Sequence, residues 1–163
     1  IQGENFEDIV LNNGQSFDER ESLQILLRVV QVVQYLHENK IIHRDLRLPN
    51  IIEKDKKIYV IDFGLSLQLE KVRANEISNS VKDQNLFKEK SVQGDFYALG
   101  HFLLFLLYSN FKADEKIEKS WEEELTISNG TKKLLRKLLR IDESFRDIYQ
   151  IVFEIEFILN QEL

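Results

Sequence analysis

The composition of this chain is notable first for residues that it lacks. Its 163 residues include no cysteine, no methionine, one proline and six glycines. Without cysteine the chain has neither a disulfide framework nor a cysteine metal site, and a reducing compartment such as the cytoplasm is the expected location. Without methionine residue 1 is not a translation start, so we expect the chain to be cut from a longer polypeptide or to be engineered.

Long apolar runs and an excess of positive charge are also missing. The longest apolar run, Phe96–Tyr108, has thirteen residues and is interrupted by Gly100 and His101. It is shorter than the roughly 20 residues that cross a bilayer, and the polar start shows no signal peptide, so no membrane association is expected. A net charge of −6 argues against a nucleic-acid partner, which requires a basic surface.

The remaining composition is that of a globular protein. Hydrophobic residues make up 43% of the chain and charged residues 31%, and the length suits a single domain over residues 1–163. We expect helices over 6–11, from Ser16 or Asp18 to Asn39, and over 95–109, 114–124, 131–140 and 144–160, with strands at 41–42, 51–52 and 58–61. The predicted fold class is therefore mainly α with a small β-hairpin.

Three stretches carry more specific expectations. The helix ending at Asn39 is apolar on nearly every side, which predicts a helix that is buried all round. The charged residues Glu53–Lys57 separate two β-rich runs and predict the turn of the hairpin. The polar stretch Lys71–Lys90 has little periodicity and predicts an exposed loop.

Two motifs carry the chemistry, HRDLRLPN at 43–50 and IDFG at 61–64. Asp45 lies five residues before Asn50 and could accept the proton of an attacking hydroxyl. The amide oxygen of Asn50 and the carboxylate of Asp62, on facing loops of one hairpin, suit a hard cation such as Mg²⁺. Arg47 could neutralise a transferring phosphoryl group, and Gly64 would let the backbone turn sharply after Asp62. Each residue alone has an ordinary interpretation as a turn, a loop hydrogen bond or a packed histidine, but the joint pattern favours phosphoryl transfer.

At these motifs, and at GDFYALG (94–100) and IDESFR (141–146), the chain resembles the C-terminal lobe of a eukaryotic-type protein kinase over essentially its whole length. The resemblance implies ATP and Mg²⁺ as cofactors, Asp45 as the catalytic base, and Asn50 and Asp62 as magnesium ligands. It places Ile52 beneath the adenine ring and so adds Ile52 to the cofactor-binding residues.

The same resemblance implies a set of supporting residues. Asp95 would hold the backbone of the catalytic loop, and His43 and Phe63 would belong to the regulatory hydrophobic spine. Arg146 matches a buried arginine of the family. The whole supporting set is His43, Arg44, Phe63, Gly64, Asp95 and Arg146, and Arg44 could also pair with a phosphoserine of the activation segment.

The chain departs from the family pattern in several places. Its six glycines are scattered, so there is no glycine-rich phosphate loop, and no strand carries the ATP-binding lysine. We therefore expect the architecture of a kinase C-lobe with the N-lobe absent. No Ala-Pro-Glu motif follows Gly64. Arg47 replaces the lysine usual in serine/threonine kinases, although a serine or threonine acceptor is still favoured.

Two functions stay open at this point. One is a phosphotransferase, favoured because the motif residues are intact. The other is a non-catalytic binding module, either a pseudokinase or a domain of the kinase non-catalytic C-lobe type. The expected partners are a protein substrate or partner protein, an N-lobe supplied in trans, or a second copy, because without an N-lobe Ile52 and its neighbours would form an exposed apolar patch.

Overall fold

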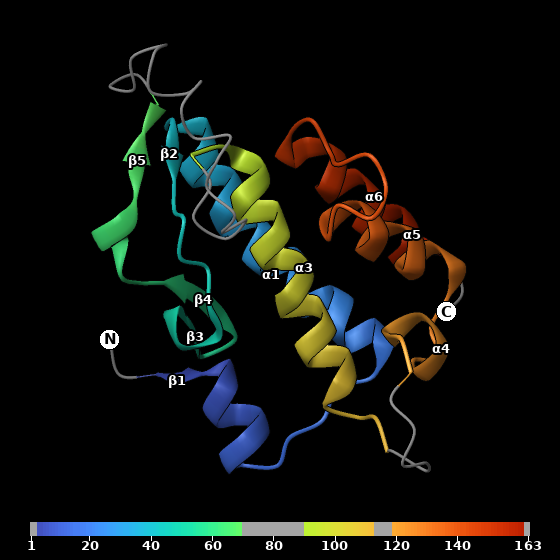
Figure 1. Ribbon diagram of the computed structural model, residues 1–163. Coiled ribbons are helices and arrows are strands. Elements are labelled where there is room, and N and C mark those ends of the chain that lie inside the picture. Colours follow the sequence, from blue (N-terminus) through green and yellow to red (C-terminus); the bar gives the residue numbers. More distant parts are fainter. Residues whose placement is uncertain (1–2, 70–89, 113–118, 162–163) are drawn as a thin grey trace.

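The computed structural model describes residues 3–69, 90–112 and 119–161, and it shows a mainly helical protein with two small antiparallel sheets (Figure 1). The α-helices are α1 (Glu19–Glu38), α3 (Val92–Tyr108), α4 (Trp121–Glu124), α5 (Asn129–Leu138) and α6 (Ile148–Asn160). The strands are β1 (Glu4–Asn5), β2 (Ile41–Ile42), β3 (Ile51–Lys54), β4 (Lys57–Val60) and β5 (Leu67–Gln68). A π-helix (Asp8–Asn12) and short 3-10 turns (Leu48–Asn50, Phe63–Leu65) complete the list.

Helix α3 lies in the middle of the molecule, between the strands on one side and α5 and α6 on the other (Figure 1). Phe96, Leu99 and Leu103 on this helix are inaccessible to solvent and belong to one hydrophobic cluster that joins all the larger helices. Gly100 permits the close crossing of α5, because a Cβ there would lie 3.0 Å from the Cβ of Leu138. This central helix positions both loops that carry the sequence motifs.

Helix α1 begins at a capping box. The carboxylate of Asp18 accepts a hydrogen bond from the Glu21 amide (2.8 Å), and the carboxylate of Glu21 accepts one from the Asp18 amide (2.9 Å). Of the two predicted caps, Asp18 is therefore the one used. The expectation that α1 is buried all round is wrong, because a polar face that includes Gln31 and Tyr35 is exposed.

The hairpin of β3 and β4 is confirmed, with Ile51 opposite Val60 and a two-residue turn at Asp55 and Lys56. Both turn residues have positive φ (50° and 61°), which is the geometry of the tight hairpin turns that match strand twist. The sequence did not predict β1, which pairs with β3, or β5, which pairs with β2. Both added strands are two residues long and gain their hydrogen bonds only from distant segments.

Several predicted boundaries change. Helix α6 begins after Asp147, whose side chain caps it, rather than at Ser144. Helix α4 is a single turn beginning at Trp121, and Lys119 and Ser120 before it are not helical. Residues 114–118 of the predicted 114–124 helix, like most of the predicted Lys71–Lys90 loop, lie outside the described residues. Among the helices that the structure describes, none has the length and apolar character needed to cross a bilayer.

Candidate active site

A buried carboxylate on α3 holds the backbone of the loop that follows β2. Asp95, with no solvent exposure, accepts hydrogen bonds from the backbone amides of His43 (3.0 Å) and Arg44 (2.8 Å). The His37 ring at the end of α1 places Nε2 2.8 Å from the same carboxylate. One acid thus joins two helices to the loop, and hydrogen bonds to an ionised group are stronger than neutral ones.

His43 connects this loop to the hairpin. Its Nε2 lies 3.1 Å from the Ile61 carbonyl, and its Nδ1 lies 3.2 Å from the Asp45 amide. A carbonyl can only accept and an amide N–H can only donate, so these partners assign the neutral ring with hydrogen on Nε2. The ring is fully buried and meets Phe63 edge to face at 4.8 Å between centroids. His43 therefore fixes both the loop of Asp45 and the approach to Asp62.

Asp45, Arg47 and Asn50 form one hydrogen-bonded group. Arg47 binds the Asp45 carboxylate with both branches of its guanidinium, Nε to Oδ1 at 2.7 Å and Nη2 to Oδ2 at 3.1 Å. The Asn50 amide nitrogen donates to Oδ2 at 3.0 Å and to the Asp45 carbonyl at 2.9 Å. The hydrogen bonds to Asp45, then the charges of Asp45 and Asp62, raise the pKa of Arg47. The negative charge of Asp62 therefore also acts on Arg47.

The orientation of Asn50 is set by its partners. Both acceptors on Asp45 attract the amide nitrogen, so the amide oxygen is turned away from Asp45. Within the described ranges no protein group donates to that oxygen. The Asn50 carbonyl accepts from the Ile61 amide at 3.0 Å, which ties the start of β3 to the residue before Asp62. The facing-loop arrangement expected for Asn50 and Asp62 is thus present in the backbone.

The segment from Asp62 to Leu65 is the exposed side of the site. Asp62 adopts a left-handed backbone (φ 62°), and its Oδ1 accepts from the Gly64 amide at 3.2 Å. The sharp turn was expected at Gly64, but Gly64 does not have positive φ and the left-handed residue is Asp62 itself. Arg44, just before Asp45, is also left-handed (φ 68°). Strained residues of this kind concentrate at functional sites.

The oxygen atoms suit a magnesium ion that is completed by other ligands. Asn50 offers an amide oxygen and Asp62 the second oxygen of an exposed carboxylate. In the part of the chain that the structure describes, no three acidic, histidine or cysteine side chains come together as a ready metal site. Magnesium is commonly held by one or two side chains while phosphates and water fill its other positions. The donor set therefore fits a metal that arrives with a phosphate compound.

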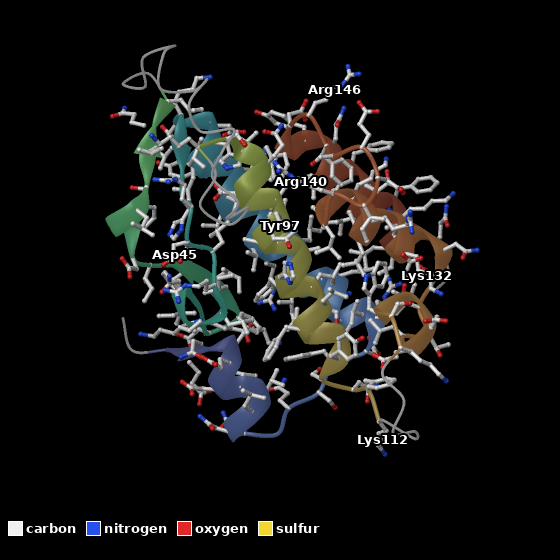
Figure 2. The ribbon with its side chains drawn as sticks, viewed as in Figure 1. Asp45, Tyr97, Lys112, Lys132, Arg140 and Arg146 are labelled. Atoms are coloured by element: carbon white, nitrogen blue, oxygen red, sulfur yellow. The ribbon has the colours of Figure 1, made fainter. Side chains whose placement is uncertain are left out.

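Two predicted residues are placed differently from the expectation. Ile52 is not exposed: only 8% of it is accessible, and the backbone of Gly3 covers it so closely that a Cβ at position 3 would lie 2.6 Å from Ile52 Cγ2. The expected apolar patch at this position is therefore absent. Arg146 is exposed rather than buried, and it lies far from the Asp45 region (Figure 2).

Arg44 reaches the segment after Asp62, since its Nη1 donates to the Leu65 carbonyl at 3.1 Å. This contact spans the two motifs on the exposed side, as His43 does on the buried side. The pairing of Arg44 with a phosphoserine falls on a segment that lies largely outside the described residues. That idea stays a prediction.

A groove beside Asp45 was not predicted. It has a volume of about 600 Å³ and lies between the catalytic-motif loop and α3. Arg47 and Pro49 line one wall, and His101, Phe105 and Tyr108 line the other. Burial lowers the pKa of His101 and, with a hydrogen bond to Glu124, raises that of Tyr108 to about 12. The helical spacing of 101, 105 and 108 is the only sequence signal for this groove. The contact of His37 with the Asp95 carboxylate was not predicted from the sequence either.

Known proteins resemble this chain over most of its length. A family model described as "Protein kinase domain" matches residues 1–158. The chain is 38% identical over 146 residues to the "Probable serine/threonine-protein kinase YbdM" of Bacillus subtilis, covering 90% of the chain and 53% of that protein. It is 27% identical to "Serine/threonine-protein kinase B" of Synechocystis, covering 90% of the chain and 29% of that protein. It is 35% identical to "Putative serine/threonine-protein kinase R436" of Acanthamoeba polyphaga mimivirus, covering 69% and 43%. The chain thus spans about half or less of the length of these relatives.

Proposed function

This chain belongs to the protein kinase domain family, and on that basis we propose that it carries the catalytic-loop half of a phosphotransferase. The proposed reaction moves the γ-phosphate of ATP to a protein hydroxyl, with serine or threonine favoured. The observation that carries the proposal is the group of Asp45, Arg47 and Asn50, joined by hydrogen bonds and tied through the hairpin to Asp62. It combines a base, a cation and two oxygen donors.

Asp45 is the proposed base. As the acceptor hydroxyl oxygen bonds to the γ-phosphorus and the bond to the ADP oxygen breaks, the hydroxyl proton passes to the Asp45 carboxylate. Asn50 holds that carboxylate in place at 3.0 Å, and Asp95 fixes the backbone of the same loop from α3. The loop is therefore set before a substrate arrives, which is how positioned groups lower a barrier.

Arg47 is the proposed charge partner of the transferring group. Its side chain is 64% exposed and is attached to Asp45 only by its guanidinium, so the guanidinium can move from the carboxylate to a phosphoryl oxygen by side-chain rotation. That movement would free Asp45 to accept a proton. Magnesium, held by Asn50 and Asp62 together with the phosphates, would neutralise charge on those phosphates.

We further propose that residues 1–163 work as one unit, a C-lobe. The chain has no glycine-rich phosphate loop, and it spans about half or less of the length of its relatives. The cover over the phosphates would come from another segment of the same protein or from a second polypeptide. The small exposed fraction of Ile52 leaves a narrow area for an adenine ring, so most nucleotide contacts would come from that other segment.

The test is phosphate transfer by the full-length polypeptide with radiolabelled ATP and Mg²⁺. Asp62→Ala removes one proposed metal ligand and should lower the rate at least ~100-fold, the scale of losing one electrostatic contact in a transition state. Asp62 is exposed, so the variant should stay folded, and thermal unfolding checks that alanine at this left-handed position (φ 62°) costs no more than about 1–2 kcal/mol. Asp142→Ala, which removes another exposed acid, is the matched control and should keep full activity. Magnesium-dependent activity that survives Asp62→Ala would end this proposal.

One observation favours the alternative, a non-catalytic binding module. Both oxygens of the Asp45 carboxylate already accept hydrogen bonds from Arg47 or Asn50, so in this arrangement the carboxylate is occupied by partners within the chain. The two functions separate in a thermal-shift titration of the full-length polypeptide with ATP and Mg²⁺. A kinase shows a nucleotide-dependent rise in Tm that Asp62→Ala removes, whereas a binding module shows no rise and retains a protein partner in a pull-down.

A further inference from the structure

Helix α6 has two apolar faces, and only one of them is used by the core. Its aliphatic face packs inward through Ile148, Ile151, Ile155 and Ile158. The other face carries Tyr149, Phe153 and Phe157, which are 56%, 68% and 53% exposed. We name these three side chains the aromatic ridge. Their spacing of four residues places them one above another along the helix.

The aromatic ridge differs from the other exposed apolar side chains of the described residues. Phe153 and Phe157 already stack on each other, with centroids 6.4 Å apart and ring planes 17° apart. Leu11 is equally exposed at 65%, but it lies on the π-helix at the opposite end of the molecule from α6 (Figure 1). Scattered apolar residues on a surface are ordinary, whereas a contiguous aromatic face points to an interaction site.

Charges near the aromatic ridge are sorted toward its two ends. At the C-terminal end, exposed Arg20 of α1 donates to the Leu159 carbonyl at 3.2 Å. At the N-terminal end, the Tyr149 hydroxyl donates to Glu38 of α1 at 2.9 Å, and the helix cap Asp147 lies beside it. Exposed Arg146 is at the same end, where its amide donates to Gln150 Oε1 at 3.0 Å, so two carboxylates there accompany one guanidinium. The hydrogen bonds from Gln34 and then Tyr149 lower the pKa of Glu38, so this end stays negative at neutral pH. The C-terminal end therefore carries the positive charge of Arg20, and the N-terminal end has an excess of one negative charge from Glu38 and Asp147 over Arg146.

We propose that the aromatic ridge binds a second copy of this chain, with the two α6 helices antiparallel and a two-fold axis near Phe153. In such a pairing residue 153 + k of one copy faces 153 − k of the other, so Phe157 meets Tyr149 of the second copy. Arg20, bound at Leu159, then faces Asp147 and Glu38 of the second copy. The opposite charges at the two ends thus select an antiparallel second copy.

The two glutamates on α6 are compatible with this register. Helix α6 carries Glu154 and Glu156 but no lysine or arginine. Under the same two-fold, Glu156 faces Gln150 of the second copy, and Glu154 faces Val152. No carboxylate is placed directly against its own counterpart. A parallel pairing would instead align each glutamate with itself and each charged end with an equal charge, which is unfavourable.

The size of the aromatic ridge predicts weak association. Fully buried aromatic side chains hide about 150–250 Å² each, so three half-exposed rings offer on the order of 300–400 Å² per copy. Stable complexes bury about 800 Å² per partner. We therefore expect a dimer that forms at tens to hundreds of micromolar and dissociates on dilution. This expectation concerns assembly and does not depend on the proposed phosphate transfer.

The first experiment is sedimentation equilibrium of the full-length polypeptide over ~10–500 µM. Phe153→Asp places a charge at the two-fold and should raise the dimer dissociation constant at least tenfold. Leu11→Asp, a change of the same kind at an equally exposed site, should leave the constant unchanged. Thermal unfolding of both variants checks that they are folded. A monomer throughout this range, or equal constants for the two variants, would overturn the proposal.

The second experiment tests the register by cross-linking. Under mild oxidation Phe153→Cys should form a disulfide between copies, detected as a 153–153 linked peptide by mass spectrometry. A mixture of Tyr149→Cys and Phe157→Cys should also link. Phe157→Cys alone should not, because its two copies would be about 12 Å apart along the axis, beyond the roughly 7 Å that a disulfide spans. A 157–157 link without a 153–153 link would contradict the antiparallel arrangement.

Discussion

The two halves of the candidate site are built in different ways. On the loop side His43, Asp45 and Asn50 are 0%, 8% and 7% exposed, and each is held by at least two hydrogen bonds. On the other side the segment that begins at Asp62 is exposed, with Phe63 at 44%. Its contacts are a local turn, the edge of the His43 ring and the bond from Arg44 to Leu65.

The difference indicates that the loop of Asp45 is held by the fold, whereas the segment that begins at Asp62 is left more open to ligands. The loop of the proposed base Asp45 is fixed by the fold itself, through Asp95 on the central helix. The side proposed to bind metal is placed by the hairpin backbone but has few contacts that cover it, so a bound nucleotide and metal would supply much of its order. Such weakly packed segments are where proteins place parts that respond to ligands. Three substitutions test how far the contrast holds.

The largest effect is expected at Asp95. Asp95→Ala leaves two backbone amides and the His37 ring without their buried acceptor, so we expect the free energy of unfolding to fall by about 3–5 kcal/mol. Denaturant titration measures this change. Exposed Asp142, which binds Arg136 at 2.8 Å, is the control, and its replacement by alanine should change stability little. Similar losses for both variants would mean that the loop is not anchored from α3.

A smaller effect is expected at Phe63. Phe63→Ala removes one edge-to-face contact with His43 from a ring that is already 44% exposed, so a loss of about 0.5–1.5 kcal/mol is expected. Phe96→Ala, at a fully buried ring on α3, should cost about 3–5 kcal/mol in the same titration. If Phe63→Ala were as damaging as Phe96→Ala, the exposed segment would be as firmly packed as the core, and the contrast would fail.

The smallest effect is expected at Gly64. A Cβ there would approach only Asp62 Oδ1, at 3.1 Å, and that carboxylate can move, so Gly64→Ala should stay within about 0.5 kcal/mol of the parent. Gly14 is the comparison, since it has φ 67° and alanine at that angle costs about 1–2 kcal/mol. Thermal unfolding of the two alanine variants measures both losses of stability. A larger loss at Gly64 would show that the turn needs glycine after all.

Local signals in the sequence predicted much of the fold. The Asp18 cap, the hairpin and the predicted helices that fall on described residues each depend on residues within a few positions of one another, and each of these is present. Asp45 and Asn50 meet for the same reason, being five residues apart on one turn of chain. Where neighbours along the chain decide the structure, the pattern of residues was sufficient.

The errors fall where distant segments meet. Ile52 was expected to be exposed because the covering backbone of Gly3 is far away in sequence. Strands β1 and β5 are too short to carry a periodic pattern, so only their partners define them. The resemblance implied that Arg146 was buried, but no residue pattern near it requires burial. The paired hydrogen bonds from Arg47 to the Asp45 carboxylate were not predicted, because Arg47 was expected to contact a transferring phosphoryl group, which is not part of the chain.

The left-handed backbone at Asp62 limits what this position can become. Among residues with a Cβ, asparagine and aspartate accept such angles most readily, glycine accepts them freely, and branched side chains such as valine or threonine are strongly disfavoured. Few residue types at position 62 therefore preserve the shape of the turn, and of these only aspartate also keeps the negative charge. A substitution that removes this carboxylate without disturbing the backbone is therefore restricted to asparagine or glycine.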